Sequence, residues 1–183
     1  MSPSLTMIDS AGEWQPDWLA QGVRVHRSAW VDVGAVIGIG TVIWHNTHVR
    51  STAIIGEACS IGQCCYVDAD AQIGSRCKIA NGVNIYSGVV IGVACFVGPN
   101  TTFTNDWWPR AVDSAGGVIQ FCDPAKTRVC DGASIGAGCV ILPVIIGARA
   151  MIGAGSVVTK DVAADTRYSC IAAVSLREIA PSR

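Results

Sequence analysis

Residues able to bind a polar, anionic ligand gather in the stretch "FTNDWWPRA" at positions 103–111. Asn105 and Asp106 offer oxygens for hydroxyl groups or for an ammonium group. Arg110 carries a planar guanidinium that can pair with a diphosphate. Trp107 and Trp108 can stack on a base or a sugar ring, or can hold the segment against a neighbouring subunit. The alternative is a structural turn in which Asp106 and Arg110 bond each other or the backbone.

Two other stretches carry side chains suited to an amine substrate: "KIANGVNIYSGV" at 78–89 and "IWHNTHV" at 43–49. Asn81 and Asn84 each present an amide donor and acceptor, although asparagine also suits a left-handed corner. His45 and His48 can act as general bases. Tyr86 can reach a nucleotide. All five side chains are predicted to point outward.

These stretches lie within a six-residue repeat that covers most of the chain. A large apolar residue, here called the inward residue, recurs at every sixth position, with one five-residue step in "ILPVIIG" at 141–147. A six-residue unit fits a short strand and a tight turn, and three units close one triangular coil of a parallel β-helix. The inward residues are Val25, Val31, Ile37, Ile43, Val49, Ile55, Ile61, Val67, Ile73, Ile79, Ile85, Ile91, Val97, Phe103, Val129, Ile135, Ile141, Ile146, Ile152 and Val158. The pattern therefore predicts an all-β fold of about seven coils.

The positions between the inward residues carry a second pattern. The fourth residue after an inward residue is small, and five of the nine cysteines occupy this place: Cys59, Cys65, Cys77, Cys95 and Cys139. They are predicted to be buried, reduced thiols. The residue directly after an inward residue is often glycine, which we expect at corners with positive φ. No C-x-x-C spacing occurs, so zinc is poorly supported and the compartment is predicted to be reducing, hence cytoplasmic.

Composition excludes several classes of function. Charged residues make up 15% of the chain and the formal net charge is −1, which gives no basic surface for nucleic acid or an anionic membrane. No signal sequence and no apolar run of about 18 residues is present. The low charge predicts that the protein buries surface by self-association.

The repeat divides the chain into three parts. Residues 1–24 are predicted to be an N-terminal cap, and residues 25–162 the β-helix domain with an inserted loop at 104–128. Residues 163–183 are predicted to be a C-terminal cap with a short helix. The insertion is too long for a passive connection, so we expect it to be functional or disordered.

The stepped pattern, closed by "IGAGSVVTKDV" at 152–162, resembles the hexapeptide-repeat acyltransferases over roughly residues 25–165. The resemblance implies a left-handed β-helix, a homotrimer, and acetyl-coenzyme A as cosubstrate in a groove between two subunits. It further implies that the cofactor contacts Gly153, Ala154, Gly155, Lys160 and Arg167. The left hand comes from the resemblance alone, because the usual crossover rule favours the opposite hand.

A narrower resemblance joins the three stretches quoted above. Together they are similar to the branch that N-acetylates nucleotide-linked (UDP or dTDP) amino sugars, especially 3-amino deoxy sugars. Members carry a T-N-D-x-x-P-R loop, commonly with Arg-Tyr where this chain has Trp107 and Trp108. The resemblance implies catalytic roles for Asn81 and His48 and no metal. It implies substrate binding by Asn84, Tyr86, Asn105, Asp106, Trp107 and Arg110.

The implied reaction is attack of a sugar amine on a thioester carbonyl. An amine beside ring oxygens should have a pKa of about 8, so about a tenth of it is neutral at pH 7. Alignment can then supply most of the acceleration, with a backbone N–H holding the oxyanion. A dedicated base is helpful but not compulsory.

Three other functions remain open from the sequence. The acceptor can be a 4-amino sugar of the viosamine type. A β-helix with histidines between subunits can also be a zinc hydratase similar to the γ-type carbonic anhydrases. Finally, the prism can be a non-catalytic scaffold.

Overall fold

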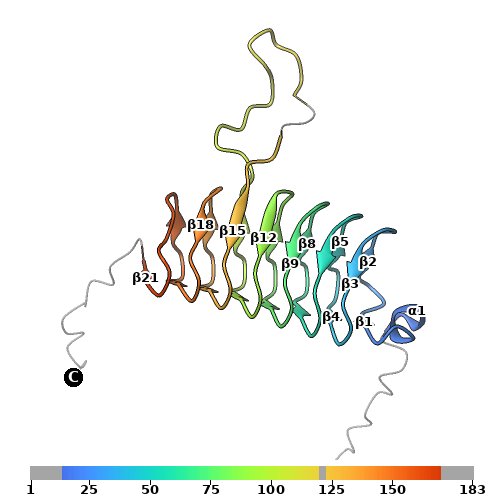
Figure 1. Ribbon diagram of the computed structural model, residues 1–183. Helices are drawn as coiled ribbons and strands as arrows, with labels where there is room; N and C mark the ends of the chain where they lie inside the picture. The colour runs from blue at the N-terminus through green and yellow to red at the C-terminus, as the bar shows by residue number, and fades with distance from the viewer. Residues whose placement is uncertain (1–13, 120–122, 170–183) are drawn as a thin grey trace, which may run out of the picture.

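The computed structural model describes residues 14–119 and 123–169, which form a triangular prism of stacked coils (Figure 1). Three parallel sheets make the sides. The first sheet contains β1 (Arg24–Val25), β4 (Val42–Ile43), β7 (Ser60–Ile61), β10 (Lys78–Ile79), β13 (Phe96–Val97), β16 (Ser134–Ile135), β19 (Met151–Ile152) and β21 (Arg167–Tyr168). The second contains β2 (Trp30–Val31), β5 (His48–Val49), β8 (Tyr66–Val67), β11 (Asn84–Ile85), β14 (Thr102–Phe103), β17 (Val140–Ile141) and β20 (Val157–Val158). The third contains β3 (Val36–Ile37), β6 (Ile54–Ile55), β9 (Gln72–Ile73), β12 (Val89–Ile91), β15 (Thr127–Val129) and β18 (Ile145–Ile146).

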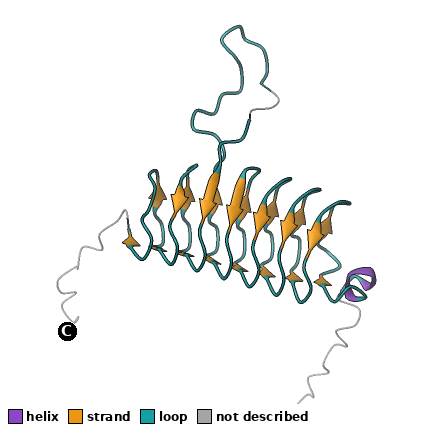
Figure 2. Cartoon of the chain, viewed as in Figure 1, coloured by secondary structure: helices purple, strands orange, loops and turns teal. Residues whose placement is uncertain are grey.

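The order of the strands confirms the predicted parallel β-helix with three strands in each coil. Consecutive strands belong to different sheets, each strand from β1 to β17 pairs with the one three places further along the chain, and β19 pairs with β21. Figure 2 shows the resulting rows of short strands joined by turns. The coils on either side of a strand supply hydrogen-bond partners for its backbone N–H and C=O groups. Strands of two residues could not satisfy these groups alone.

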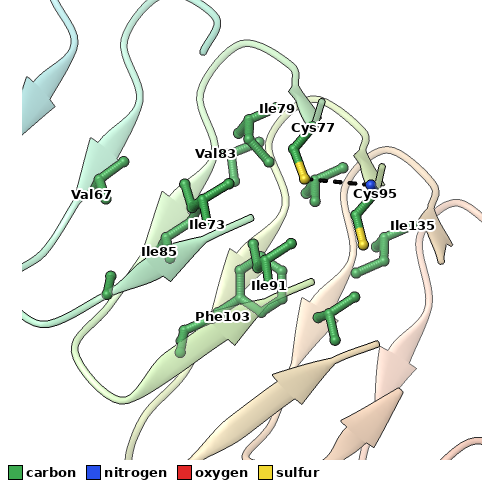
Figure 3. Packing of buried hydrophobic residues seen from close by; sticks show 14 of the residues in the cluster. Val67, Ile73, Cys77, Ile79, Val83, Ile85, Ile91, Cys95, Phe103 and Ile135 are labelled. Carbon is green, nitrogen blue, oxygen red and sulfur yellow. Dashed lines mark hydrogen bonds between the residues drawn. The ribbon is translucent and has the colours of Figure 1, made fainter. Parts of the chain in front are cut away.

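The interior is a column of the inward residues. Ile43, Ile61 and Ile85 are completely buried, and Phe103 is the largest side chain in the column. Figure 3 shows inward side chains of successive coils stacked directly on one another. Only in the first coil are the inward residues, Val31 and Ile37, partly exposed.

The predicted thiol column is confirmed. Cys59, Cys65, Cys77, Cys95 and Cys139 are all buried. The Sγ of Cys77 donates to the Gly92 carbonyl at 3.0 Å and accepts from the Cys95 N–H at 3.4 Å (Figure 3). Burial raises the pKa of the Cys65 thiol. These cysteines therefore serve as small buried side chains.

The expectation for the glycines is wrong in its mechanism. Glycines directly after an inward residue do not have positive φ; the third residue after it does, as in Asn46, Ala58 and Gly138. The glycines are needed because coils approach closely: a Cβ at Gly98 would lie 2.5 Å from the Ala137 nitrogen. The left-handed corner tolerates other residues because a single left-handed position costs only about 1–2 kcal/mol.

The ends of the prism differ. At the N-terminal end, α1 (Pro16–Leu19) packs against β1, and the Gln15 N–H donates to the Val25 carbonyl at 2.8 Å. At the other end, β21 pairs with β19. The predicted C-terminal helix and most of the predicted N-terminal cap lie outside the described residues. No helix in the described part of the chain is long and apolar enough to span a membrane.

The insertion leaves the prism between β14 and β15 and projects away from it (Figure 1). Its two ends are held together by the Ala125 N–H, which donates to the Asn105 carbonyl at 2.8 Å. Its outer part contains an antiparallel bridge between Val112 and Val118. The Val93 N–H donates to Asp131 Oδ1 across 38 residues, whereas the equivalent bond from the Glu57 N–H to Ser75 Oγ spans 18 residues. The coils before and after the insertion therefore stack without a gap. The loop is therefore added to one corner of an uninterrupted prism.

Candidate functional site

The outer face of the second sheet carries a network of polar side chains, here called the polar row. Its members come from successive coils, because strands of this sheet pair in register: His48 with Tyr66, and Tyr66 with Asn84. The polar row consists of Asp32, His48, Arg50, Tyr66, Asp68, Asn84 and Tyr86. Of these, His48, Asn84 and Tyr86 were predicted site residues.

Asp32 holds the N-terminal end of the polar row. Its Oδ1 lies 3.0 Å from His48 Nε2, and its Oδ2 accepts from Arg50 Nε at 3.2 Å and from the Ser51 N–H at 3.3 Å. The hydrogen bond from His48 lowers the pKa of the Asp32 carboxyl. Because Asp32 occupies Nε2, the second ring nitrogen of His48 remains for a ligand or a proton.

Tyr66 links Asp68 to Arg50 within the polar row. Its hydroxyl donates to Asp68 Oδ1 at 3.0 Å and accepts from Arg50 Nη1 at 3.2 Å. The ring lies 5.8 Å from His48 and 5.7 Å from Tyr86, centroid to centroid. Asn84 donates weakly to Thr102 Oγ1 at 3.5 Å, so its amide is largely available for a ligand. The fixed groups run from the first coil towards the base of the inserted loop.

Sequence reasoning missed Asp32, Arg50, Tyr66 and Asp68. The signal is an 18-residue period beneath the six-residue one. The residue directly after an inward residue is often glycine on the first and third sheets, but never on the second. There it is Asp32, Arg50, Asp68, Tyr86, Thr104, Leu142 and Thr159.

Asn81 lies elsewhere, at the corner between the first and second sheets. It lines a hollow of about 540 Å³ on the first sheet, called the N-terminal hollow. Its Oδ1 accepts from the Gln63 N–H at 3.1 Å, which leaves the amide NH2 as a donor. The hollow is lined by Trp44, His45, Ser60, Gly62, Gln63, Lys78, Ile79, Ala80, Asn81 and Pro99. The structure thus brings Asn81 together with His45 and not with His48.

Aromatic rings support one wall of the N-terminal hollow. Trp44 and His45 are stacked, with an interplanar angle of 9° and centroids 6.1 Å apart. Trp14 packs on Trp44 edge to face at 5.6 Å, and His26 lies 3.7 Å from His45. Trp44 Nε1 donates to Ser60 Oγ at 3.3 Å. The wall is held in place by residues from three strands and the N-terminal segment.

Two more hollows follow along the first sheet. One of about 280 Å³ is lined by Phe96, Ser134 and Met151 among others. The last, of about 460 Å³, includes Gly153 and Arg167, two of the predicted cofactor residues. The three hollows form one line on the outer face, from coil to coil.

The other predicted cofactor residues occupy two corners. Ala154 and Gly155 are exposed beside Gly153, and Gly155 has a φ of +70°. Lys160 is exposed after β20, at the corner between the second and third sheets. Within one chain, Lys160 is therefore at a corner away from Arg167, which lies in β21 on the first sheet.

In the inserted loop, Asp106 Oδ1 accepts from the Trp108 N–H at 2.8 Å. Trp108 is 80% exposed and Trp107 is 42% exposed. Asp106 and Arg110 form no ion pair with each other or with other described residues. Asn105 lies directly after Thr104, which extends β14 in the second sheet. The loop therefore starts beside the polar row, with Arg110 and both indoles turned outward.

The described part of the chain contains no cluster of side chains that supports a metal site. Among residues 14–119 and 123–169, no group of three or more His, Cys, Asp or Glu side chains is arranged to hold a metal ion. His45 lies in the turn after β4, whereas His48 lies in β5 of the second sheet.

No protein-family model and no curated protein matches the sequence. Solved structures do share the fold. The acetyltransferase domain of PglB from Neisseria gonorrhoeae is 21% identical, with a TM-score of 0.53, over 64% of this chain and 48% of that chain. A variant of perosamine N-acetyltransferase from Caulobacter crescentus, in complex with CoA and GDP-perosamine, is 20% identical, with a TM-score of 0.52, over 80% of this chain and 52% of that chain.

A third structure is similar over most of both chains. A variant of AntD, an N-acyltransferase from Bacillus cereus in complex with dTDP and coenzyme A, is 17% identical, with a TM-score of 0.51 and 86% coverage of each chain. The chain spans about half the length of the PglB domain and the perosamine enzyme. The resemblance to hexapeptide-repeat sugar N-acetyltransferases is thus confirmed at the level of the fold.

Proposed function

We propose that the protein is an N-acetyltransferase that transfers acetyl from acetyl-coenzyme A to the amino group of a nucleotide-linked amino sugar. The observation that carries this proposal is the line of three hollows on the first sheet. It joins Gly153 and Arg167, expected to contact the coenzyme, to Asn81, expected to contact the reacting amine. Strand β10, which precedes Asn81, and strand β21, which carries Arg167, are four coils apart, about 19 Å at the usual strand spacing, which suits an extended cosubstrate.

The solved structures support the chemistry. The perosamine enzyme is a nucleotide-sugar N-acetyltransferase with CoA bound, and AntD binds dTDP and coenzyme A. For the acceptor we propose a 3-amino deoxy sugar linked to UDP or dTDP, because the loop Thr104–Arg110 matches the motif of that branch. Asn84, Tyr86, Asn105, Asp106, Trp107 and Arg110 would contact the nucleotide sugar, and Lys160 the coenzyme.

We propose a homotrimer with the active site between two subunits. Asn81 lines the N-terminal hollow at the corner between the first and second sheets, whereas His48 lies in β5 of the second sheet and does not line that hollow. A site that uses both residues can be assembled more readily when one subunit supplies Asn81 and its neighbour supplies His48. Asn81 would orient the amine, and His48, held by Asp32, would accept a proton as the amine attacks the thioester carbonyl. The coenzyme leaves as the thiol.

The test is to incubate the full chain with acetyl-coenzyme A and UDP-, dTDP- and GDP-linked 3- and 4-amino sugars, and to measure free thiol. We expect turnover with a 3-amino sugar and slower or no turnover with its 4-amino isomer. Turnover of 4-amino sugars alone would correct the acceptor. No thiol release with any of them would refute the acetyltransferase.

Two variants test the roles and the assembly. We expect Asn81→Ala to lose much more activity than His45→Ala, because only Asn81 is proposed to orient the amine. Coexpressed Asn81→Ala and His48→Ala chains should recover about a quarter of wild-type activity, since random mixing leaves about one in four intersubunit sites intact. No recovery in a verified mixed trimer would mean that one subunit supplies both residues.

A further inference from the structure

The N-terminal hollow contains groups that the proposed transfer of acetyl does not use. Its volume of about 540 Å³ is within the range of small-molecule sites, about 300–1,000 Å³. Asn81 is the only lining residue with a role so far. The remaining side chains define which ligand fits.

One wall offers a flat aromatic surface. Trp44 and His45 lie nearly parallel, and Trp44 is fixed by its hydrogen bond to Ser60 and by the edge of Trp14. Trp44 still exposes 38% of its surface. An indole that its neighbours already hold in place, and that is still partly exposed, provides a stacking platform for a heteroaromatic ring.

The opposite side of the hollow offers positive charge and donors. Lys78 projects from β10, in register between Ser60 and Phe96, and forms no ion pair with any described residue. None of the lining residues is acidic. An anionic group beside Lys78 would therefore be bound by charge-assisted hydrogen bonds without a repelling carboxylate.

We propose that the N-terminal hollow binds a nucleoside diphosphate group, with the base against Trp44 and the diphosphate beside Lys78. This inference rests on the proposed function and deepens it: the nucleotide of the acceptor is held by the first sheet. The polar row is the less suitable place, because Asp32 and Asp68 would repel a diphosphate. Coenzyme A carries a nucleoside diphosphate too, so the two sources need separate measurements.

The experiment is calorimetric titration of the full chain with UDP, dTDP, GDP and coenzyme A, each alone. Lys78→Met and Trp44→Leu are compared with Arg128→Met, which removes a similar charge from β15 in the third sheet. We expect at least one of the three free nucleotides to bind, with a Kd raised about tenfold in Lys78→Met and in Trp44→Leu. Arg128→Met should bind it like the wild type.

Several results would overturn the inference. They are no binding of any nucleoside diphosphate, or binding that neither Lys78→Met nor Trp44→Leu weakens. If both variants weaken only coenzyme A binding, the hollow belongs to the coenzyme and the assignment to the acceptor is wrong. Unfolding temperatures of the variants control for misfolding. Because nucleotide binding is measured without turnover, a failure to transfer acetyl refutes the proposed function and leaves this test intact.

Discussion

The outer faces of the first and second sheets are built on one repeat but differ in chemistry. On the first sheet the residue after the inward residue is glycine or alanine over five consecutive coils, from Gly62 to Gly153, and hollows form above it. On the second sheet the same place holds Asp32, Arg50 and Asp68, which fill the face with hydrogen bonds. The side chain at one repeat position therefore decides whether a face is hollowed or is covered by a network of polar groups.

The largest expected effect concerns the polar row. His48→Ala should lower kcat about 100-fold, because a positioned base typically contributes at least that much. The affinity for a nucleoside diphosphate should stay nearly unchanged, since Trp44 and Lys78, and not His48, are proposed to bind it. Steady-state kinetics and calorimetry together measure both quantities. A variant with normal kcat and a raised KM would contradict the proposal that the second sheet supplies the base and the first sheet binds the nucleotide.

The next effect tests the glycine row. Gly98→Ala should lower the free energy of unfolding by about 2 kcal/mol, because the new Cβ meets the backbone of the next coil. Gly138→Ala is the matched control: it has open space and a φ of +65°, as the non-glycine Ala94 tolerates at +57°, and should cost about 1 kcal/mol. Denaturant unfolding measures both changes. Equal losses would mean that backbone conformation, not coil spacing, requires glycine after the inward residue.

A smaller effect is expected from Asp32→Asn. The amide keeps the shape and can still accept from His48, but it cannot stabilise a charged imidazole or pair with Arg50. We expect kcat to fall about tenfold with little change in KM, as for other residues that orient a functional group. Asp165→Asn, which breaks the exposed pair with Arg149, is the control and should leave kcat unchanged. Wild-type kcat in Asp32→Asn would show that His48 needs no partner.

The smallest effect is on stability in acid. The pKa of Asp32 is lowered in the folded chain by its hydrogen bond from His48. Its contribution is therefore complete above the unfolded value of about 4 and disappears as the pH falls through the folded pKa. Between pH 5 and pH 3, the unfolding temperature of Asp32→Asn should fall slightly less than that of the wild type. Parallel curves for the two proteins would remove Asp32 from the acid response.

The fold was largely predictable because the repeat is a local signal. Each inward residue from Ile43 to Val158 is buried, and the five cysteines at the fourth position after an inward residue are buried as well. The corner residues were harder. Glycine after Val97 suggested a left-handed turn, but its cause is contact with a coil 38 residues away, which no local pattern reports.

The candidate site was predictable only in part. His48, Asn84 and Tyr86 do share a face, because they are one coil apart in the second sheet. Asn81 was predicted to act with His48, yet it lies three residues before Asn84, at the corner beside the second sheet and not on its face. The roles of Asp32 and Tyr66 do not follow from their local sequence, since they depend on neighbours 16 residues away.

Apolar periodicity directly specifies burial, so the all-β coil, its inward residues, the buried thiols and the position of the insertion could all be predicted from the sequence. Which outward residues meet depends on how the coils stack. Stacking brings every eighteenth residue into contact, so it separates Asn81 from His48, joins His48 to Asp32, and opens the hollow beside Lys78. An outward side chain can be polar or apolar without the energetic cost of burying a polar group. Its function therefore depends on which residues lie beside it in space.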